Sequence, residues 1–151
     1  MANKSYSSLG ELVAAVKKAA GAALESPTVL NVIKEEIRKA EQQEVYDSYA
    51  TEHYWRRGSL GKNFQVERIN PYAIQIWDIA PPAPSVRNTL YKGPPGWFAQ
   101  WINDGRVTNI FNNRQDYPWT KARPFYETAD ARLQRSTALK KAVLNGIKSQ
   151  L

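Results

Sequence analysis

Cysteine is absent from this chain of 151 residues, and histidine occurs once, at position 53. Without thiols, no disulfide can cross-link the fold and no thiolate can bind a metal ion. With a single histidine, the two-histidine zinc site typical of zinc hydrolases is excluded within one chain. We therefore expect no metal site and no cofactor, and a chain suited to a reducing compartment.

Long apolar runs are also missing, so the sequence predicts no segment that crosses a bilayer and no membrane partner. The first five residues lack the apolar core of a secretory signal. Hydrophobic residues still make up 42% of the chain, which is enough for one buried core. We expect a single domain over residues 1–151.

Recognisable catalytic motifs are lacking as well. His53 has no nucleophile at an informative spacing, and Gly58–Lys62 lacks the glycine spacing of a phosphate-binding loop. An acidic site around Asp78 and Asp104 stays open as an alternative, although no spacing marks these residues as an acid–base pair. The sequence therefore favours a protein that is not an enzyme, with no catalytic residues to assign.

Positive charge is in excess, with a formal net charge of +7 spread along the chain. The segment Tyr54–Lys62 combines aromatic and basic side chains. Its Arg56, Arg57 and Lys62 could neutralise phosphates, and Trp55 could stack on an exposed base. A basic nucleic-acid-binding protein that contacts DNA through this segment and the C-terminal helix is therefore one candidate function.

The N-terminal part, residues 7–49, is predicted to be helical. Ser8 and Glu11 have the spacing of a capping box, and a one-sided apolar stripe follows. Ser26 and Pro27 have the types expected at the N-cap and first position of a second helix. The charged residues of this second helix, Glu41 among them, are interpreted as a solvated face.

The middle part, residues 51–121, is predicted to contain the sheet and the loops. Alternating residues over 64–69 and 72–79 indicate two strands, with Asn70-Pro71 as the tight connection. The proline-rich stretch 80–96 predicts a long loop. Residues 97–105 indicate a short helix or strand that ends at Asp104-Gly105.

The C-terminal part, residues 123–150, is predicted to form one terminal helix that begins after Ala122. Pro124 suits a first helical turn, and a nearly regular apolar stripe follows from Phe125 to Ile147. The expected fold class is α+β, with the N-terminal helices and the C-terminal helix packed on a small antiparallel sheet and a long proline-rich middle loop.

Several large side chains are candidates either for the core or for contacts with other subunits. Tryptophan supplies a large contact area at little entropic cost, and prolines restrict loops that dock. Phe125 is expected to fill the core facing the sheet. The interface candidates are Trp97, Trp101, Trp119, Arg123, Phe125, Pro82 and Pro94.

The order of these features resembles a known family. Gly58-Ser59-Leu60 leads into a strand, an aromatic segment ends at Asp104-Gly105, and Ala122–Phe125 starts the terminal helix, with Ala129 following. This order resembles the neck, or tail-completion, family of tailed bacteriophages, whose members join head and tail. The chain departs from the family at Asn103–Arg106, where an acidic residue, glycine and threonine are usual, and at the proline-rich segment.

The resemblance implies a structural virion protein without enzymatic activity that forms part of the ring-shaped neck. Its implied partners are copies of itself and other neck, connector and tail proteins, with possible non-specific contact with DNA passing through. Its implied location is the virion, and the host cytoplasm during assembly. Such a ring needs a head-to-tail interface that closes on itself.

Overall fold

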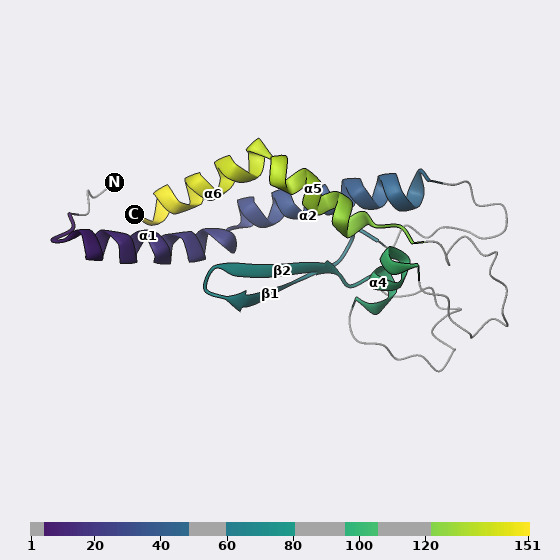
Figure 1. The fold of residues 1–151 in the computed structure, drawn as a ribbon, viewed down its shortest axis with the longest axis horizontal. Coiled ribbons are helices and arrows are strands. Elements are labelled where there is room, and N and C mark those ends of the chain that lie inside the picture. The colour runs from purple at the N-terminus through teal and green to yellow at the C-terminus, as the bar shows by residue number, and fades with distance from the viewer. Residues whose placement is uncertain (1–4, 49–59, 81–95, 106–121) are drawn as a thin grey trace.

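The computed structural model describes residues 5–48, 60–80, 96–105 and 122–151, and it confirms the α+β class. Figure 1 shows α1 beside α6 at one end, α2 beside α5 in the middle, and a two-stranded hairpin along the same side as α1. The elements in order are α1 (Leu9–Leu24), α2 (Pro27–Glu41), the π-helical turn η1 (Gln42–Tyr46), β1 (Phe64–Asn70), β2 (Ala73–Asp78), α4 (Trp97–Asp104), α5 (Phe125–Arg135) and α6 (Thr137–Gln150).

Both predicted N-terminal helix starts are confirmed. The Ser8 hydroxyl accepts a hydrogen bond from the Glu11 backbone N–H at 3.2 Å, and Glu11 in turn accepts the backbone N–H of Ser7 at 2.8 Å. Ser26 caps α2, and Pro27 occupies its first turn, where the missing N–H has no intrahelical acceptor to lose. These caps fix where the chain turns between α1 and α2.

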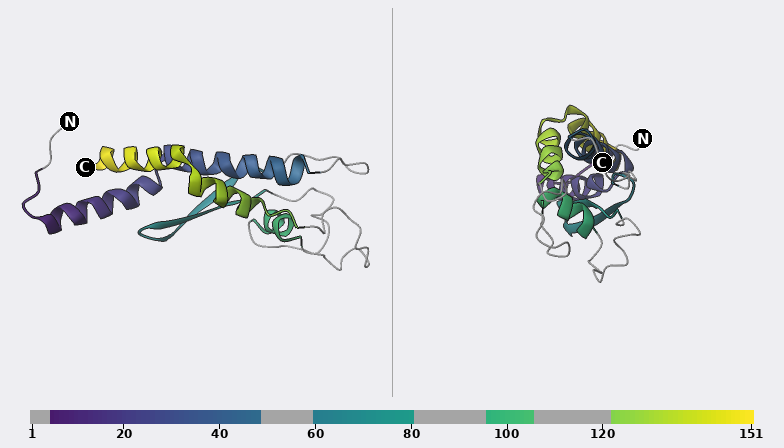
Figure 2. Two further views of the ribbon diagram at one scale, coloured as in Figure 1. Left: turned by 45° about the horizontal axis from the view of Figure 1, so that its top comes forward. Right: turned by 90° about the vertical axis from the view of Figure 1, so that its right-hand side faces the viewer.

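The hairpin is antiparallel, and Phe64 pairs with Asp78 at its base. At its tip the Asn70 side chain accepts the Tyr72 backbone N–H at 2.8 Å, which confirms the predicted tight connection. In Figure 2 the hairpin runs from its base near α4 and α5 back toward α1, and its tip contacts α1 at Gly21.

Gly21 and Arg68 attach the hairpin to α1. A Cβ at position 21 would lie 2.6 Å from the Pro71 carbonyl oxygen, so only glycine allows this approach. The Arg68 guanidinium donates to the Gly21 carbonyl at 3.0 Å and to the Glu25 carboxylate at 2.6 Å. The C-terminal half of α1 is therefore fixed to the hairpin tip.

The core lies where α2, the base of the hairpin, α4 and α5 meet. Phe125 is fully buried at its centre, as expected, among small and aliphatic side chains. The buried members of this cluster are Ile37, Ala40, Val45, Leu60, Ala80, Ala99, Phe125 and Ala129. Many of them are alanines, so this core depends heavily on one large aromatic residue.

The prediction of one terminal helix is wrong, because Ser136 divides it into α5 and α6. Ser136 has an extended backbone, with φ of −71° and ψ of 113°, and its hydroxyl accepts the Leu139 N–H at 3.1 Å. The break lets α5 pack on α2 while α6 reaches α1. The apolar stripe shows the break as a six-residue step from Leu133 to Leu139, which is not a helical interval.

The middle part is helical at α4, which resolves the choice between helix and strand for residues 97–105. Gly105 ends α4 in the left-handed conformation, with φ of 66°, and its N–H donates to the Trp101 carbonyl. The predicted proline-rich loop lies mostly outside the described residues. The single-domain organisation stays a prediction.

We expect Phe125→Ala to lower the free energy of unfolding by about 3–5 kcal/mol, because it leaves a cavity that the surrounding alanines cannot fill. Urea unfolding followed by circular dichroism measures this loss. The control is Leu144→Ala, at a side chain that is 56% exposed. Equal stability of the two variants would contradict the central place of Phe125.

Candidate assembly surface

The two motifs that end α4 and begin α5 form one junction. The Arg123 backbone N–H donates to the Asn103 carbonyl at 3.0 Å and to the Ile102 carbonyl at 3.2 Å. The Asn103 side chain, which is 3% exposed, accepts the Tyr126 N–H at 3.0 Å. About twenty residues separate these motifs in the sequence, and neither spacing nor periodicity predicts their contact.

The Arg123 side chain extends this junction to the end of the N-terminal helices. It is 7% exposed, and its guanidinium donates to the Ser48 hydroxyl and to the Glu44 carbonyl, the latter at 3.4 Å. In the single chain, Arg123 and Phe125 are therefore interior residues that hold the start of α5. Whether either contributes to contacts between subunits stays a prediction.

Trp97 and Trp101 lie one turn apart on α4 and are both half-buried. Their rings meet edge to face with centroids 4.6 Å apart, and Phe98 adds a second edge contact to Trp97 at 5.9 Å. Partial exposure leaves aromatic surface available to a partner. The other interface candidates, Trp119, Pro82 and Pro94, lie outside the described residues.

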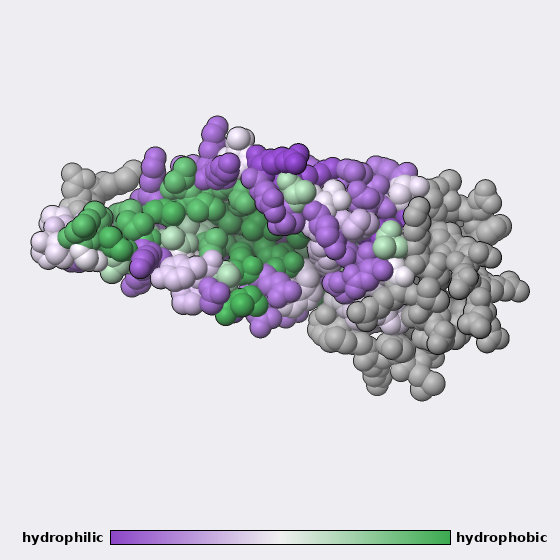
Figure 3. All heavy atoms as spheres, in the orientation of Figure 1, coloured by the Kyte–Doolittle hydropathy of each residue, from purple (hydrophilic) through white to green (hydrophobic). Residues whose placement is uncertain are grey.

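A large apolar area covers the opposite end of the molecule, over α1 and α6 (Figure 3). The largest patch on a typical monomer is about 300–600 Å², and patches of this kind mark interaction surfaces. In the described residues, no helix is long and apolar enough to cross a membrane. Among the described residues, the exposed large apolar side chains are Leu9, Leu12, Val13 and Val16 on α1, Leu144 on α6, and Ile69 and Tyr72 near the hairpin tip.

A buried pair of carboxyl groups, Glu41 and Asp78, lies at the base of the hairpin. Asp78 is fully buried, and its carboxylate accepts the backbone N–H groups of Gly61 and Ala80, the latter at 2.5 Å. The Asp78 backbone N–H donates to the Tyr126 hydroxyl at 3.0 Å. Asp78 therefore connects the segments just before β1 and just after β2 with α5.

Glu41 is 1% exposed, and neither of its carboxyl oxygens has a hydrogen-bond donor within the described part of the chain. Burial, and then the charge of Asp78, raise the pKa of Glu41 to about 9, against a weaker opposing effect of Arg38. Burial also raises the pKa of Asp78, but its two backbone donors favour the ionised form. Glu41 is therefore the group that keeps a proton at neutral pH.

The interpretation of Glu41 as part of a solvated face is wrong, because its side chain is buried. Glu41 lies four residues after the buried Ile37 and so continues the apolar stripe of α2. This helical spacing indicates a buried position. The carboxyl type masked this signal, because buried acids are rare unless paired. Asp104, the other half of the alternative acidic site, lies at the end of α4 and not in this pair.

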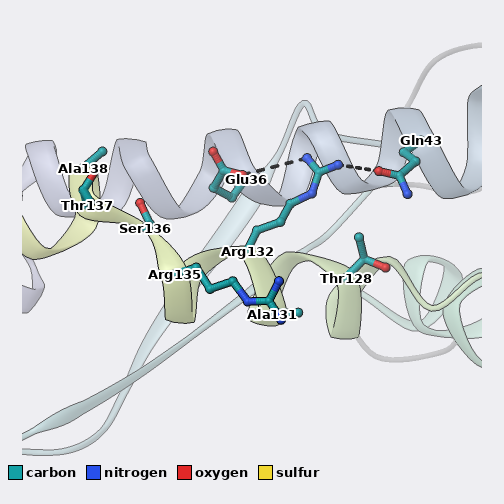
Figure 4. Close-up of a pocket in the computed structure, with 9 residues that line it drawn as sticks. All are labelled: Glu36, Gln43, Thr128, Ala131, Arg132, Arg135, Ser136, Thr137 and Ala138. Carbon is teal, nitrogen blue, oxygen red and sulfur yellow. Dashed lines mark hydrogen bonds and ion pairs between the residues drawn. The ribbon is translucent and has the colours of Figure 1, made fainter.

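An open groove of about 580 Å³ follows the break between α5 and α6 (Figure 4). Arg132 crosses it from α5 and faces α2, with its guanidinium 3.9 Å from the Glu36 carboxylate and in hydrogen-bond contact with Gln43. These contacts hold α5 against α2.

The residues proposed for DNA contact are mostly outside the described part of the chain, since Trp55, Arg56 and Arg57 lie within 49–59. Lys62 is described, and it is exposed just before β1. The structure therefore does not test whether the four residues form one basic surface.

We expect Glu41→Gln to remove a pH dependence of stability. The pKa of Glu41 is raised on folding from 4.5 to about 9, so folding takes up a proton between these values. Stability from this site is therefore fully present below pH 4.5 and is lost as the pH rises through about 9. Urea unfolding from pH 5 to 9 should show this fall in the wild type and a flatter profile in Glu41→Gln. Parallel profiles would contradict the raised pKa of Glu41.

A search of curated proteins and a search of solved structures each found no match. The model of the YomN family matches residues 8–149. This range contains every described helix and strand except the last residue of α6. YomN is a Bacillus phage-like protein family, and the chain is accordingly phage-related. The chain belongs to the YomN family.

Proposed function

We propose that this protein is a structural virion component of a tailed phage, forming part of the ring-shaped neck that joins head and tail. In this role it acts by presenting surfaces and is not an enzyme. Its partners are copies of itself and the neighbouring neck, connector and tail proteins. It is located in the virion, and in the host cytoplasm during assembly.

The junction between α4 and the start of α5 is the observation that supports this proposal. The resemblance to the neck family rests on two separate motifs, the aromatic segment ending in Asp104-Gly105 and the turn Arg123–Phe125. Three hydrogen bonds join these motifs through Ile102, Asn103 and Tyr126. The two motifs therefore form one structural unit, and this agrees with the resemblance.

The available surfaces agree with a protein that assembles. The half-buried Trp97 and Trp101 lie at one end of the molecule and the apolar area of α1 and α6 at the other (Figures 1 and 3). A ring subunit contacts neighbours on more than one side and needs a distinct surface for each. Family membership adds the phage context.

Removal of the gene from the phage that encodes it tests the proposal. We expect lysates with separate heads and tails under negative-stain electron microscopy, restored to joined particles by the gene supplied in trans. Mass spectrometry of purified particles should detect the chain. Complete particles formed without the gene would refute the neck role. Salt-steep binding of free DNA that weakens in Lys62→Ala would favour the nucleic-acid-binding alternative.

We expect Trp97→Ala to impair assembly more than folding, because its ring is partly exposed. The variant supplied in trans should yield at least about tenfold fewer joined particles, as expected for loss of an aromatic anchor at an interface. Its loss of unfolding free energy should stay below that of Phe125→Ala. The matched control is Gln100→Ala, at an exposed position of the same helix. Equal loss of folding and assembly would make Trp97 an ordinary core residue.

A further inference from the structure

The N-terminal half of α1 carries an apolar stripe that is exposed in the single chain. Leu9, Leu12, Val13 and Val16 recur at helical intervals, so their side chains share one face. Their exposed fractions are 76%, 36%, 43% and 37%. Further along the same helix Ala19 and Ala23 are buried, so the exposed part of this face ends before Ala19.

The position of α6 explains why only the N-terminal half of α1 exposes its apolar face. The two helices run in opposite directions side by side, and a Cβ on Gly146 would lie 2.8 Å from the Cβ of Ala23. In an antiparallel pair, Gln150 at the end of α6 then lies near Ala19. Helix α6 thus covers the C-terminal half of this face, whereas the four apolar side chains of the N-terminal half stay 36–76% exposed.

The uncovered stripe is self-complementary. Its positions read the same in both directions, since reversal exchanges Leu9 with Val16 and Leu12 with Val13. Two such stripes packed antiparallel would therefore place every apolar side chain opposite another. A parallel partner would instead run into α6, which occupies the same face from Ala19 onward.

We propose that a second copy of this chain covers the stripe, with the N-terminal halves of the two α1 helices packed antiparallel. Leu12 of each copy then faces Val13 of the other, and the start of each α1 reaches the end of the other copy's α6. The contact is isologous and closes in a pair. It is a different contact from the head-to-tail one of the proposed ring, and it does not depend on the neck function.

The size of the stripe sets the expected strength of this pair. A standard interface buries about 800 Å² on each partner, whereas this stripe consists of four side chains over two helical turns. We therefore expect a dimer with a dissociation constant in the micromolar range. Exposed stripes of this kind in a soluble chain are otherwise a cause of non-specific association.

Single-cysteine variants test the direction of packing, because the natural chain has no cysteine. Under mild oxidation we expect Leu12→Cys and Val13→Cys each to form a covalent dimer on a non-reducing gel. Leu9→Cys should not, because antiparallel packing separates the two copies of position 9 along the helix by about 10 Å. The double variant Leu9→Cys/Val16→Cys should cross-link again, and Ala14→Cys, on the opposite side of α1, should not.

Sedimentation equilibrium tests the pair itself. We expect Leu12→Lys to weaken dimerisation at least about tenfold, because it places charge in an apolar contact. Ala14→Lys is the matched control, and circular dichroism should show equal helix content for both. A wild type that stays monomeric at about 100 µM, far above a micromolar dissociation constant, would overturn the proposal. So would cross-linking of Leu9→Cys as strong as that of Leu12→Cys.

Other occupants of the stripe give distinct results. If the wild-type protein is monomeric and binds vesicles of anionic phospholipid through the stripe, a lipid surface covers the stripe. That result would refute the proposal. Particle assembly by the Leu12→Lys variant tests the neck function separately from dimerisation. A monomeric wild type in complete particles would reject the pair alone, whereas a dimer absent from particles would reject the neck alone.

Discussion

The carboxylate of Asp78 is the contact on which the rest of this structure depends. It accepts the backbone N–H groups of Gly61 and Ala80, and the Asp78 backbone N–H donates to Tyr126. The residues on either side of the hairpin base and helix α5 are therefore joined at one buried carboxylate. Such a charge is stable inside a protein only when hydrogen bonds replace its hydration, and the backbone N–H groups of Gly61 and Ala80 supply them here.

Around this point the fold is held by one large aromatic residue and many small ones. Phe125 fills the centre, and alanines on α2, α4 and α5 allow the helices to approach it closely. Arg123 and Asn103 use buried polar groups to fix the turn that delivers Phe125 into the core. The same turn carries the resemblance to phage neck proteins, so the proposed function and the stability of the core share residues.

The two ends of the molecule offer different surfaces. One end carries the aromatic residues of α4 beside the core, and the other carries the aliphatic stripe of α1 beyond the end of α6 (Figures 1 and 3). A break at Ser136 makes this separation possible, because it directs α5 toward α2 and α6 toward α1. One uninterrupted helix could not contact both partners in this way.

The sequence by itself determined the elements whose signals are local. Caps at Ser8 and Ser26, the turn at Asn70-Pro71 and the glycine stop at Gly105 depend on neighbouring residues, and each was predicted. Only the tertiary structure decided what meets across long intervals. Sequence spacing cannot show that Glu41 faces Asp78, that Asn103 holds the turn before α5, or that α6 stops short of Leu9–Val16, because these facts depend on how the helices pack.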